Sequence, residues 1–181
     1  MPLYSFDENI REVPKDLSEL RKYIQELKSG LPYLEDPVEL VTALGELGAN
    51  LRILGELHAA ETCLVEALEV IEIEKLPMMY QVQNRLRLAH VYQWQKNFRM
   101  SNLLFASTLE TCRAHAELSS YLDFALLHSG KNLFDQQKYG DALIYFEEAL
   151  LIRRERKANL EQIASSEWAI QRTKDLLGTS V

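Results

Sequence analysis

Apolar residues recur along the chain at intervals of three or four, the spacing that gathers them on one face of an α-helix. No segment keeps the strict alternation expected of a strand. The pattern predicts about eight helices: one over residues 16–29, three pairs at about 37–54 with 57–75, 78–95 with 98–116 and 120–136 with 140–157, and a last one over 160–177. The sequence therefore predicts an all-α fold.

The predicted helical pairs repeat at an offset of 41 residues. Several registers agree without a gap, among them small residues at Gly48, Ala89 and Gly130, small residues at Ala60, Ser101 and Ala142, and large apolar residues at Leu64, Phe105 and Phe146. A period of about 20–50 residues is typical of stacked repeats. We expect the small residues to let the two helices of each pair cross closely, with the large residues filling the space beside the crossing.

The order of residue types resembles the tetratricopeptide repeat family. The first unit has Leu47-Gly48, Leu51, Gly55, Leu57, Ala60, Leu64 and Ala67, the second has Leu88-Ala89, Tyr92, Phe98, Ser101, Phe105 and Thr108, and the third has Ser129-Gly130, Leu133, Tyr139, Ala142, Phe146 and Ala149. The unit is about seven residues longer than the usual 34, which is similar to the long-repeat variety found in kinesin light chains and bacterial repeat proteins. The sequence departs from the family at Ser101 and Thr108, where Ala is usual, and at Lys96, where a turn glycine is usual. The resemblance covers residues 38–157 and implies a right-handed α-α superhelix, a solenoid of three helical hairpins.

The organisation that follows is one domain over residues 16–181. It consists of an N-terminal helix at 16–29, repeats at 38–77, 78–118 and 119–158, and a C-terminal capping helix at 160–177. Terminal helices of solenoids cover an otherwise exposed apolar face. Residues 1–15 carry Ser5 and Glu8 at the spacing of a capping box and are otherwise expected to be loosely ordered.

Charge and composition narrow the function classes. The net charge of −7 argues against general nucleic-acid binding. Residues 1–80 hold 16 acidic and 7 basic side chains, whereas the rest holds 11 and 13. This asymmetry fits orientation of a charged partner, head-to-tail self-association or simply solvated helix surfaces. The first ten residues lack the basic lead and apolar core of a secretory signal, and no run approaches the roughly 20 apolar residues of a membrane span, so we expect a cytoplasmic protein with no membrane partner.

The resemblance also implies where a ligand binds, since the first helix of each pair lines a concave groove in that family. The candidate groove residues are Arg52, Gln83, Arg87, His90, Trp94, His128, Lys131 and Phe134. Arg87 is suited to hold a carboxylate through two parallel hydrogen bonds, and Lys131 adds a point charge. An acidic or C-terminal peptide segment is the expected ligand. A plain solvated helix face is the alternative for the same residues.

Other chemistry is sparse. No Ser/His/Asp set, Gly-rich phosphate loop or paired-carboxylate motif stands out, and His90, His128 and Glu46 lack the ligand spacing of a zinc site. We therefore expect no enzymatic activity, no metal and no cofactor. The one basic cluster, residues 153–157, either complements the carbonyl end of a helix or contacts an acidic protein or nucleic acid.

Three hypotheses remain from the sequence. The first is a protein-interaction scaffold that binds a peptide or protein segment in its groove. The second is a self-assembling repeat protein that forms homo-oligomers through its end helices or its oppositely charged halves. The third is an enzyme or a small-molecule sensor, for which a deep closed pocket around Arg87, His90 and Trp94 is the expected sign. A peptide-sensing regulatory module is a variant of the first hypothesis.

Overall fold

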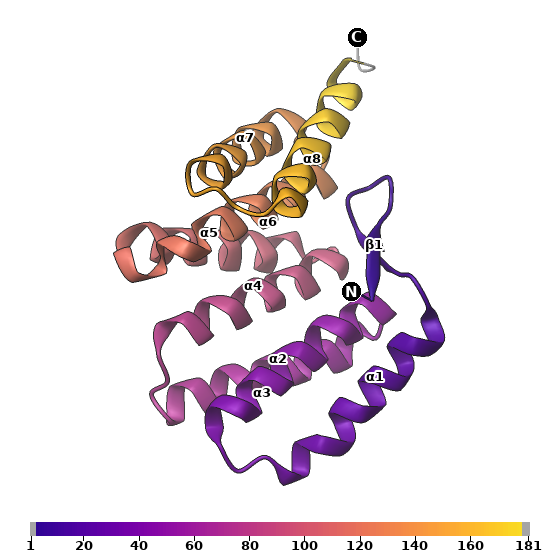
Figure 1. Ribbon diagram of the computed structural model, residues 1–181, viewed down its shortest axis with the longest axis vertical. Coiled ribbons are helices and arrows are strands. Elements are labelled where there is room, and N and C mark those ends of the chain that lie inside the picture. Colours follow the sequence, from indigo (N-terminus) through magenta and orange to yellow (C-terminus); the bar gives the residue numbers. More distant parts are fainter. Residues whose placement is uncertain (1–2, 179–181) are drawn as a thin grey trace. The chain divides into compact units, whose positions relative to one another are not determined.

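The structure is a computed structural model that describes residues 3–178 of the 181-residue chain. Within these residues it contains eight α-helices, two short 3₁₀ segments and one two-stranded sheet (Figure 1). The all-α prediction is confirmed, apart from that small sheet. The chain divides into two compact units, Met1–Asn97 and Phe98–Val181, and each is described by itself. The sequence predicted one domain, with a helical pair at 78–95 and 98–116 that includes residues on both sides of this division.

The first unit is built around one central helix. Its elements are β1 (Tyr4–Phe6), β2 (Glu12–Pro14), α1 (Leu17–Gly30), the 3₁₀ segment η1 (Leu31–Tyr33), α2 (Pro37–Leu54), α3 (Leu57–Ile73) and α4 (Met78–Trp94). Helices α1, α3 and α4 and strand β2 all contact α2. Asp36 caps the start of α2, as the Asp-Pro pair predicts, because its carboxylate accepts hydrogen bonds from the backbone N–H groups of Val38 and Glu39 at 2.7 and 3.0 Å.

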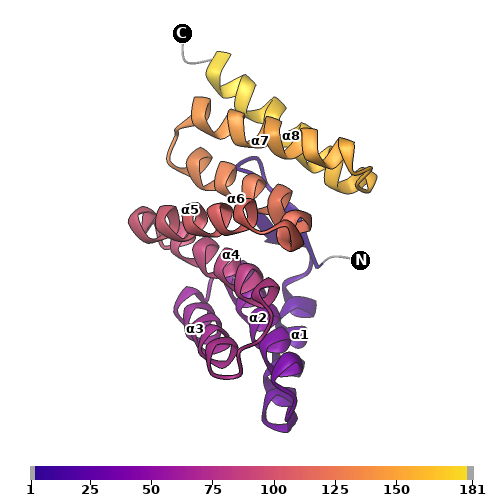
Figure 2. The same cartoon turned by 90° about the vertical axis from the view of Figure 1, so that its left-hand side faces the viewer.

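The second unit is a row of helices joined by short turns. It contains α5 (Phe98–Ala114), the 3₁₀ segment η2 (Ala116–Tyr121), α6 (Leu122–Asp135), α7 (Tyr139–Glu155) and α8 (Leu160–Gly178). Helix α6 packs on both α5 and α7, and α7 packs on α8, which runs beside it in Figure 2. All eight helices begin and end within two residues of their predicted bounds.

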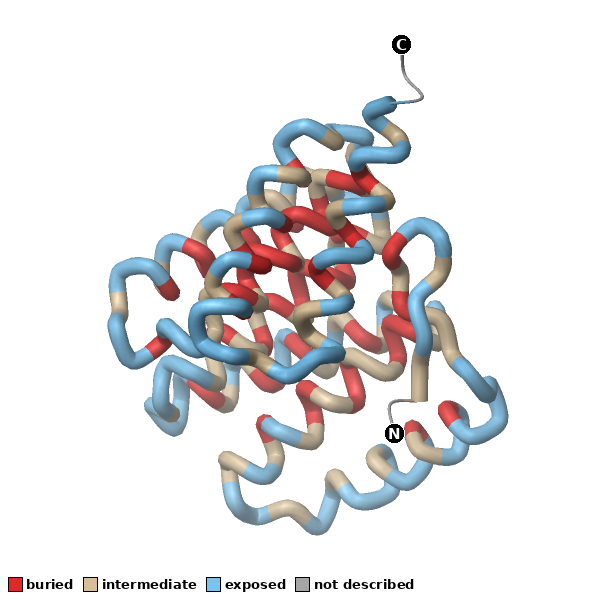
Figure 3. The backbone as a smooth tube through the Cα atoms, turned by 45° about the horizontal axis from the view of Figure 1, so that its top comes forward, coloured by how far each residue is buried: buried red, intermediate tan, exposed pale blue. Residues whose placement is uncertain are grey.

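The same close helix crossing occurs in both units. A Cβ added to Gly48 of α2 would lie 2.6 Å from Leu64 of α3, and one added to Gly130 of α6 would lie 2.5 Å from Phe146 of α7. These two contacts are related by twice the sequence offset of 41. Buried positions recur at short intervals along the helices (Figure 3). The predicted close crossing is confirmed for the pairs α2–α3 and α6–α7.

The turn after the first helix of each predicted repeat also recurs. Gly55, Lys96 and Gln137, spaced 41 residues apart, have φ angles of 89°, 59° and 61°. In each case the next backbone N–H donates to the carbonyl five residues earlier, as from Glu56 to Leu51 at 2.9 Å, which is the pairing of a Schellman motif. Only the first turn has the glycine that favours this conformation. The geometry is therefore kept at Lys96 and Gln137, where the sequence departs from the glycine.

Residues 4–14, predicted to be loosely ordered, form an antiparallel β-hairpin, and residues 1–2 of that predicted segment lie outside the described residues. Tyr4 pairs with Pro14 and Phe6 with Glu12. The capping box expected from Ser5 is wrong, because Ser5 lies in β1. Two strands of three residues each are too short to show a period of two, which is why the pattern of apolar residues did not predict them.

Candidate functional site

Three of the predicted groove residues lie on one surface of the first unit, where α2 and α4 face the hairpin. The guanidinium carbon of Arg52 lies 4.7 Å from the centroid of the Trp94 ring. Two helical turns earlier, the side chain of Arg87 lies so close to Gly45 that a Cβ there would collide with it. We name this surface the α2–α4 face; its residues are Gly45, Glu46 and Arg52 of α2 and Asn84, Arg87 and Trp94 of α4.

The Arg87 end of the face holds a partly buried guanidinium beside the carboxylate of Glu46. Burial lowers the pKa of the Arg87 guanidinium, and the charge of Glu46 opposes this shift. Glu46 is held in place by Tyr23 of α1, whose hydroxyl donates to Glu46 Oε1 at 2.6 Å. That hydrogen bond, with burial and the carboxylate charge, raises the pKa of Tyr23 to about 12. A desolvated guanidinium favours an added carboxylate, because a charge-assisted hydrogen bond replaces the lost hydration.

The Arg52 end of the face already binds a carboxylate. Arg52 Nη1 lies 3.0 Å from Oε2 of Glu12, and the two side chains are only 7% and 8% exposed. Glu12 belongs to β2, so the acidic group is presented on an extended strand. Arg11, the residue before it, lies with its guanidinium carbon 5.6 Å from the Trp94 ring centroid. The hairpin therefore lies against both helices of the face.

The hairpin's other strand contributes to the same environment. The pKa of Tyr4 is raised, first by burial and then by the charge of Glu12, while Arg52 acts in the opposite direction. Tyr4 and Phe6 lie on the side of the sheet that carries Glu12, since residues directly opposite one another in an antiparallel pair point to the same face. The rings of Tyr4 and Phe6 meet edge to face with centroids 5.7 Å apart.

Similarity to known proteins does not assign this face a role. Neither a family model nor a curated protein matches the chain. The tetratricopeptide resemblance therefore stays a prediction from the sequence registers.

The remaining predicted groove residues have varied surroundings. On α4, Gln83 is half-buried and His90 is buried. On α6, the ring of His128 stacks on Phe124 with centroids 6.4 Å apart, Phe134 packs edge-on against Tyr139, and Lys131 is buried. Five of the eight predicted residues lie in the first unit and three in the second. Their union in one groove remains a prediction.

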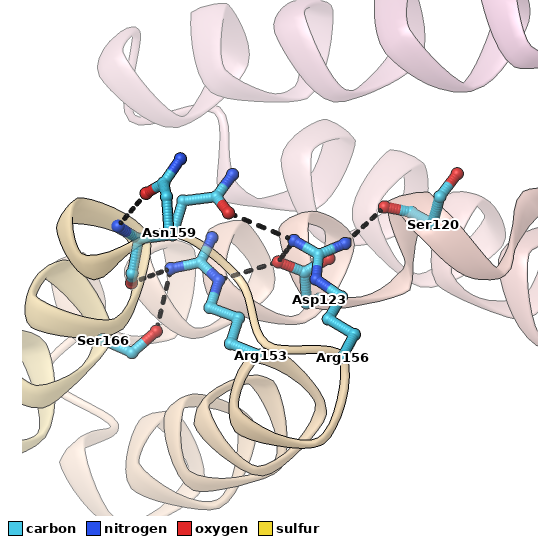
Figure 4. A network of polar contacts seen from close by, with 7 residues as sticks. Ser120, Asp123, Arg153, Arg156, Asn159 and Ser166 are labelled. Atoms are coloured by element: carbon cyan, nitrogen blue, oxygen red, sulfur yellow. Dashed lines mark hydrogen bonds and ion pairs between the residues drawn. The ribbon is translucent and has the colours of Figure 1, made fainter.

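A second buried polar cluster joins three helices of the second unit (Figure 4). Asp123, at the start of α6, accepts hydrogen bonds through Oδ2 from Arg153 Nε at 2.7 Å and from Arg156 Nη2 at 2.8 Å. Arg153 also donates to Ser166 Oγ of α8 at 2.9 Å and to the backbone carbonyl of Gln162 at 2.7 Å. Asp123 and Arg153 are almost completely buried, at 0% and 1% exposed. This network fastens α6, α7 and α8 together.

The network accounts for most of the predicted basic cluster. Besides Arg153 and Arg156, Arg154 pairs with Glu167 of α8 at 2.6 Å. Three of the four cations in residues 153–157 are thus bound inside the second unit. Arg153 and Arg154 lie in the last turn of α7, as the first alternative expected. The three arginines also join helices of this unit through their ion pairs.

The described residues show neither a candidate metal site nor a candidate membrane span. Among residues 3–178, no group of three or more His, Cys, Asp or Glu side chains is placed to hold a metal ion. No helix in the described part of the chain is long and apolar enough to cross a membrane.

The sequence did not single out Glu12, Asn84 or Tyr23 as site residues. Glu12 lies 40 positions from Arg52, and its strand is too short to leave a pattern. Asn84 lies one helical turn before Arg87, which is the one available signal, because residues three apart share a helix face.

Proposed function

We propose that the chain is a protein-interaction scaffold, a tetratricopeptide-like solenoid whose first helices bind an extended acidic segment of a partner protein. The observation that carries the proposal is the buried ion pair of Arg52 with Glu12, at 3.0 Å. It is an example within the chain of the α2–α4 face binding a carboxylate on an extended strand. Proteins commonly recognise a peptide that is bound in an extended conformation and held by particular side-chain contacts.

Two features of the face support affinity for such a segment. Arg52 is held over the Trp94 ring, so its side chain loses little further freedom on binding. Arg87, two turns away, supplies a second guanidinium whose pKa is lowered by burial. A segment with two carboxylates on an extended backbone has a complementary group for each end of the face.

A displayed library of random peptides, selected on the purified chain, tests the proposal. We expect the wild type to enrich peptides with acidic residues, and Arg87→Ala to lose a large part of that enrichment. Arg85→Ala is the matched control, because Arg85 lies on the same helix but two positions away, toward another face. Enrichment that is absent, or that survives Arg87→Ala unchanged, contradicts the proposal.

A second candidate is self-assembly through the last two helices. Ile144 and Leu151, seven residues apart on α7, are 64% and 57% exposed. Leu151 also lines a shallow hollow of about 350 Å³ between α7 and α8, together with Leu150 and Ile170. An exposed apolar face of this kind favours association. Sedimentation equilibrium of the wild type and of Leu151→Glu tests it: a mass that rises with concentration only in the wild type supports self-assembly.

A further inference from the structure

The Arg52 end of the α2–α4 face is a binding site that the chain fills with its own N-terminal hairpin. We propose that residues 4–14 are a displaceable occupant, and that an extended acidic segment of a partner protein binds by replacing Glu12 against Arg52. This inference rests on the proposed function. It specifies that a carboxylate of the partner is recognised by Arg52, and that occupancy of the site by the hairpin regulates binding.

The binding site in this contact is formed by helices α2 and α4, through Arg52 and Trp94. Arg52 lies in the last turn of α2, where its carbonyl accepts a hydrogen bond from Gly55 N at 2.9 Å in the Schellman turn. Its guanidinium is stacked over Trp94, at the end of α4. Neither contact involves the hairpin. The site therefore keeps its form when the hairpin leaves.

The hairpin that occupies the site is a less stable element than these helices. A hairpin of two three-residue strands is at best marginally stable alone, so its order depends on what it contacts. Its loop includes Ile10 at a φ of 62°, a region that β-branched residues avoid. Ile10 is buried, which indicates that tertiary contact holds this conformation against its local preference. A segment of this kind is released at lower cost than any of the helices.

The burial of Arg52 determines what can replace the hairpin. A neutral segment covering the site would leave a guanidinium out of water and unpaired, which is strongly unfavourable. A segment with a carboxylate forms a new ion pair with Arg52 in place of the one with Glu12, and its extended backbone takes the place of strand β2. The competitor is therefore expected to be extended and acidic, with one Asp or Glu taking the place of Glu12.

The experiment uses the full chain carrying Trp168→Phe, so that Trp94 is the single remaining tryptophan. The ligand is a fluorescein-labelled peptide that copies residues 3–15, LYSFDENIREVPK, and its control replaces the position of Glu12 with Gln. Anisotropy gives the affinity, and Trp94 emission reports on the site. The protein variants are Glu12→Gln, which weakens the internal contact, and Glu69→Gln, an exposed carboxylate on α3, as control.

We expect Glu12→Gln to bind the peptide about tenfold or more tightly than the wild type, because the apparent affinity of an internally occupied site is reduced to the small fraction of molecules in which the site is open. Glu69→Gln should match the wild type, and the Gln-containing peptide should bind neither. Equal affinity for wild type and Glu12→Gln overturns the displacement proposal but leaves the proposed function standing. If neither this peptide nor the library-selected acidic peptides bind any variant, the proposed function fails as well.

Circular dichroism of Glu12→Gln keeps the test decisive. We expect unchanged helicity, because the helices do not depend on the hairpin. Loss of helicity would show that the hairpin is an integral part of the fold and would overturn the proposal. Glu12→Asp, which keeps the charge but shortens the side chain, should give a gain in peptide affinity intermediate between the wild type and Glu12→Gln.

Discussion

The two units each bury a carboxylate against an arginine, but the two sites differ in what carries the acid. Asp123 belongs to a helix and accepts from two arginines, both of which also donate to α8. Glu12 belongs to a three-residue strand near the start of the chain and pairs with Arg52. The same pair of groups makes a permanent joint in one place and, we propose, an exchangeable contact in the other. In this proposal, the size of the element that carries the acid, a helix or a three-residue strand, decides which.

The largest expected effect is in the second unit. Asp123→Ala should destabilise the fold by about 3–5 kcal/mol, because it leaves Arg153 buried without its partner. Urea unfolding followed by circular dichroism measures this. Asp141→Ala, an exposed acid at the start of α7, is the control and should cost less than about 1 kcal/mol. A cost for Asp123→Ala that matches the control would contradict a structural role for the network.

The glycine crossings provide a comparison in which the two units should agree. Gly48→Leu and Gly130→Leu should each cost about 1–3 kcal/mol, because the new side chain would enter space that Leu64 or Phe146 fills. Thermal unfolding measures both. Gly140→Leu is the control, since no atom lies within 4 Å of a Cβ at that position. Unchanged stability in either crossing variant would show that the repeat register is misplaced in that unit.

A smaller and more local effect is expected at the hairpin. Glu12→Gln should cost about 1–2 kcal/mol, because the hairpin can leave and let water reach Arg52. The emission of Trp94, in the Trp168→Phe background, should shift to longer wavelength while helicity stays constant. A loss as large as that of Asp123→Ala, with falling helicity, would remove the distinction between the two sites.

The smallest effect is a pH dependence of the hairpin contact. The pKa of Tyr4 is raised above its ordinary value of 10.0 in the folded chain. The neutral phenol therefore stabilises the docked hairpin below pH 10, and this stabilisation is lost as the pH rises further. Trp94 emission should therefore begin to change above pH 10 in the wild type, and Tyr4→Phe should remove that change. Identical titrations of the two proteins would show that Tyr4 does not contribute to docking.

The sequence predicted the parts of the fold that repeat. Helix positions follow from the spacing of apolar residues, and Gly48 and Gly130 identified the crossings because a close approach requires small residues. The turn at Lys96 shows why several residues that recur at one offset locate a repeat turn better than a single motif position does. Its left-handed conformation persists without the expected glycine, because the Schellman hydrogen bonds are kept.

Pairings between distant polar residues were not predictable in the same way. Arg52 was selected by register alone, but nothing in the spacing pointed to Glu12, because one ion pair between a strand and a helix has no period. Arg153 was placed in a basic cluster on a helix end, whereas its burial depends on an acid 30 residues away. A single sequence gives the identity of such residues without their partners.

Hydrogen exchange of the full chain, read by mass spectrometry, tests most directly whether the hairpin is separable from the helices. The amides of Asp7, Ile10 and Lys15, all hydrogen-bonded within the N-terminal segment, report on the hairpin, and those of α2 and α3 report on the core. We predict that the hairpin amides exchange through a local opening, much faster than the core, and that Glu12→Gln accelerates them alone. Exchange of hairpin and core at one common rate, in the wild type and in the variant, would contradict the account.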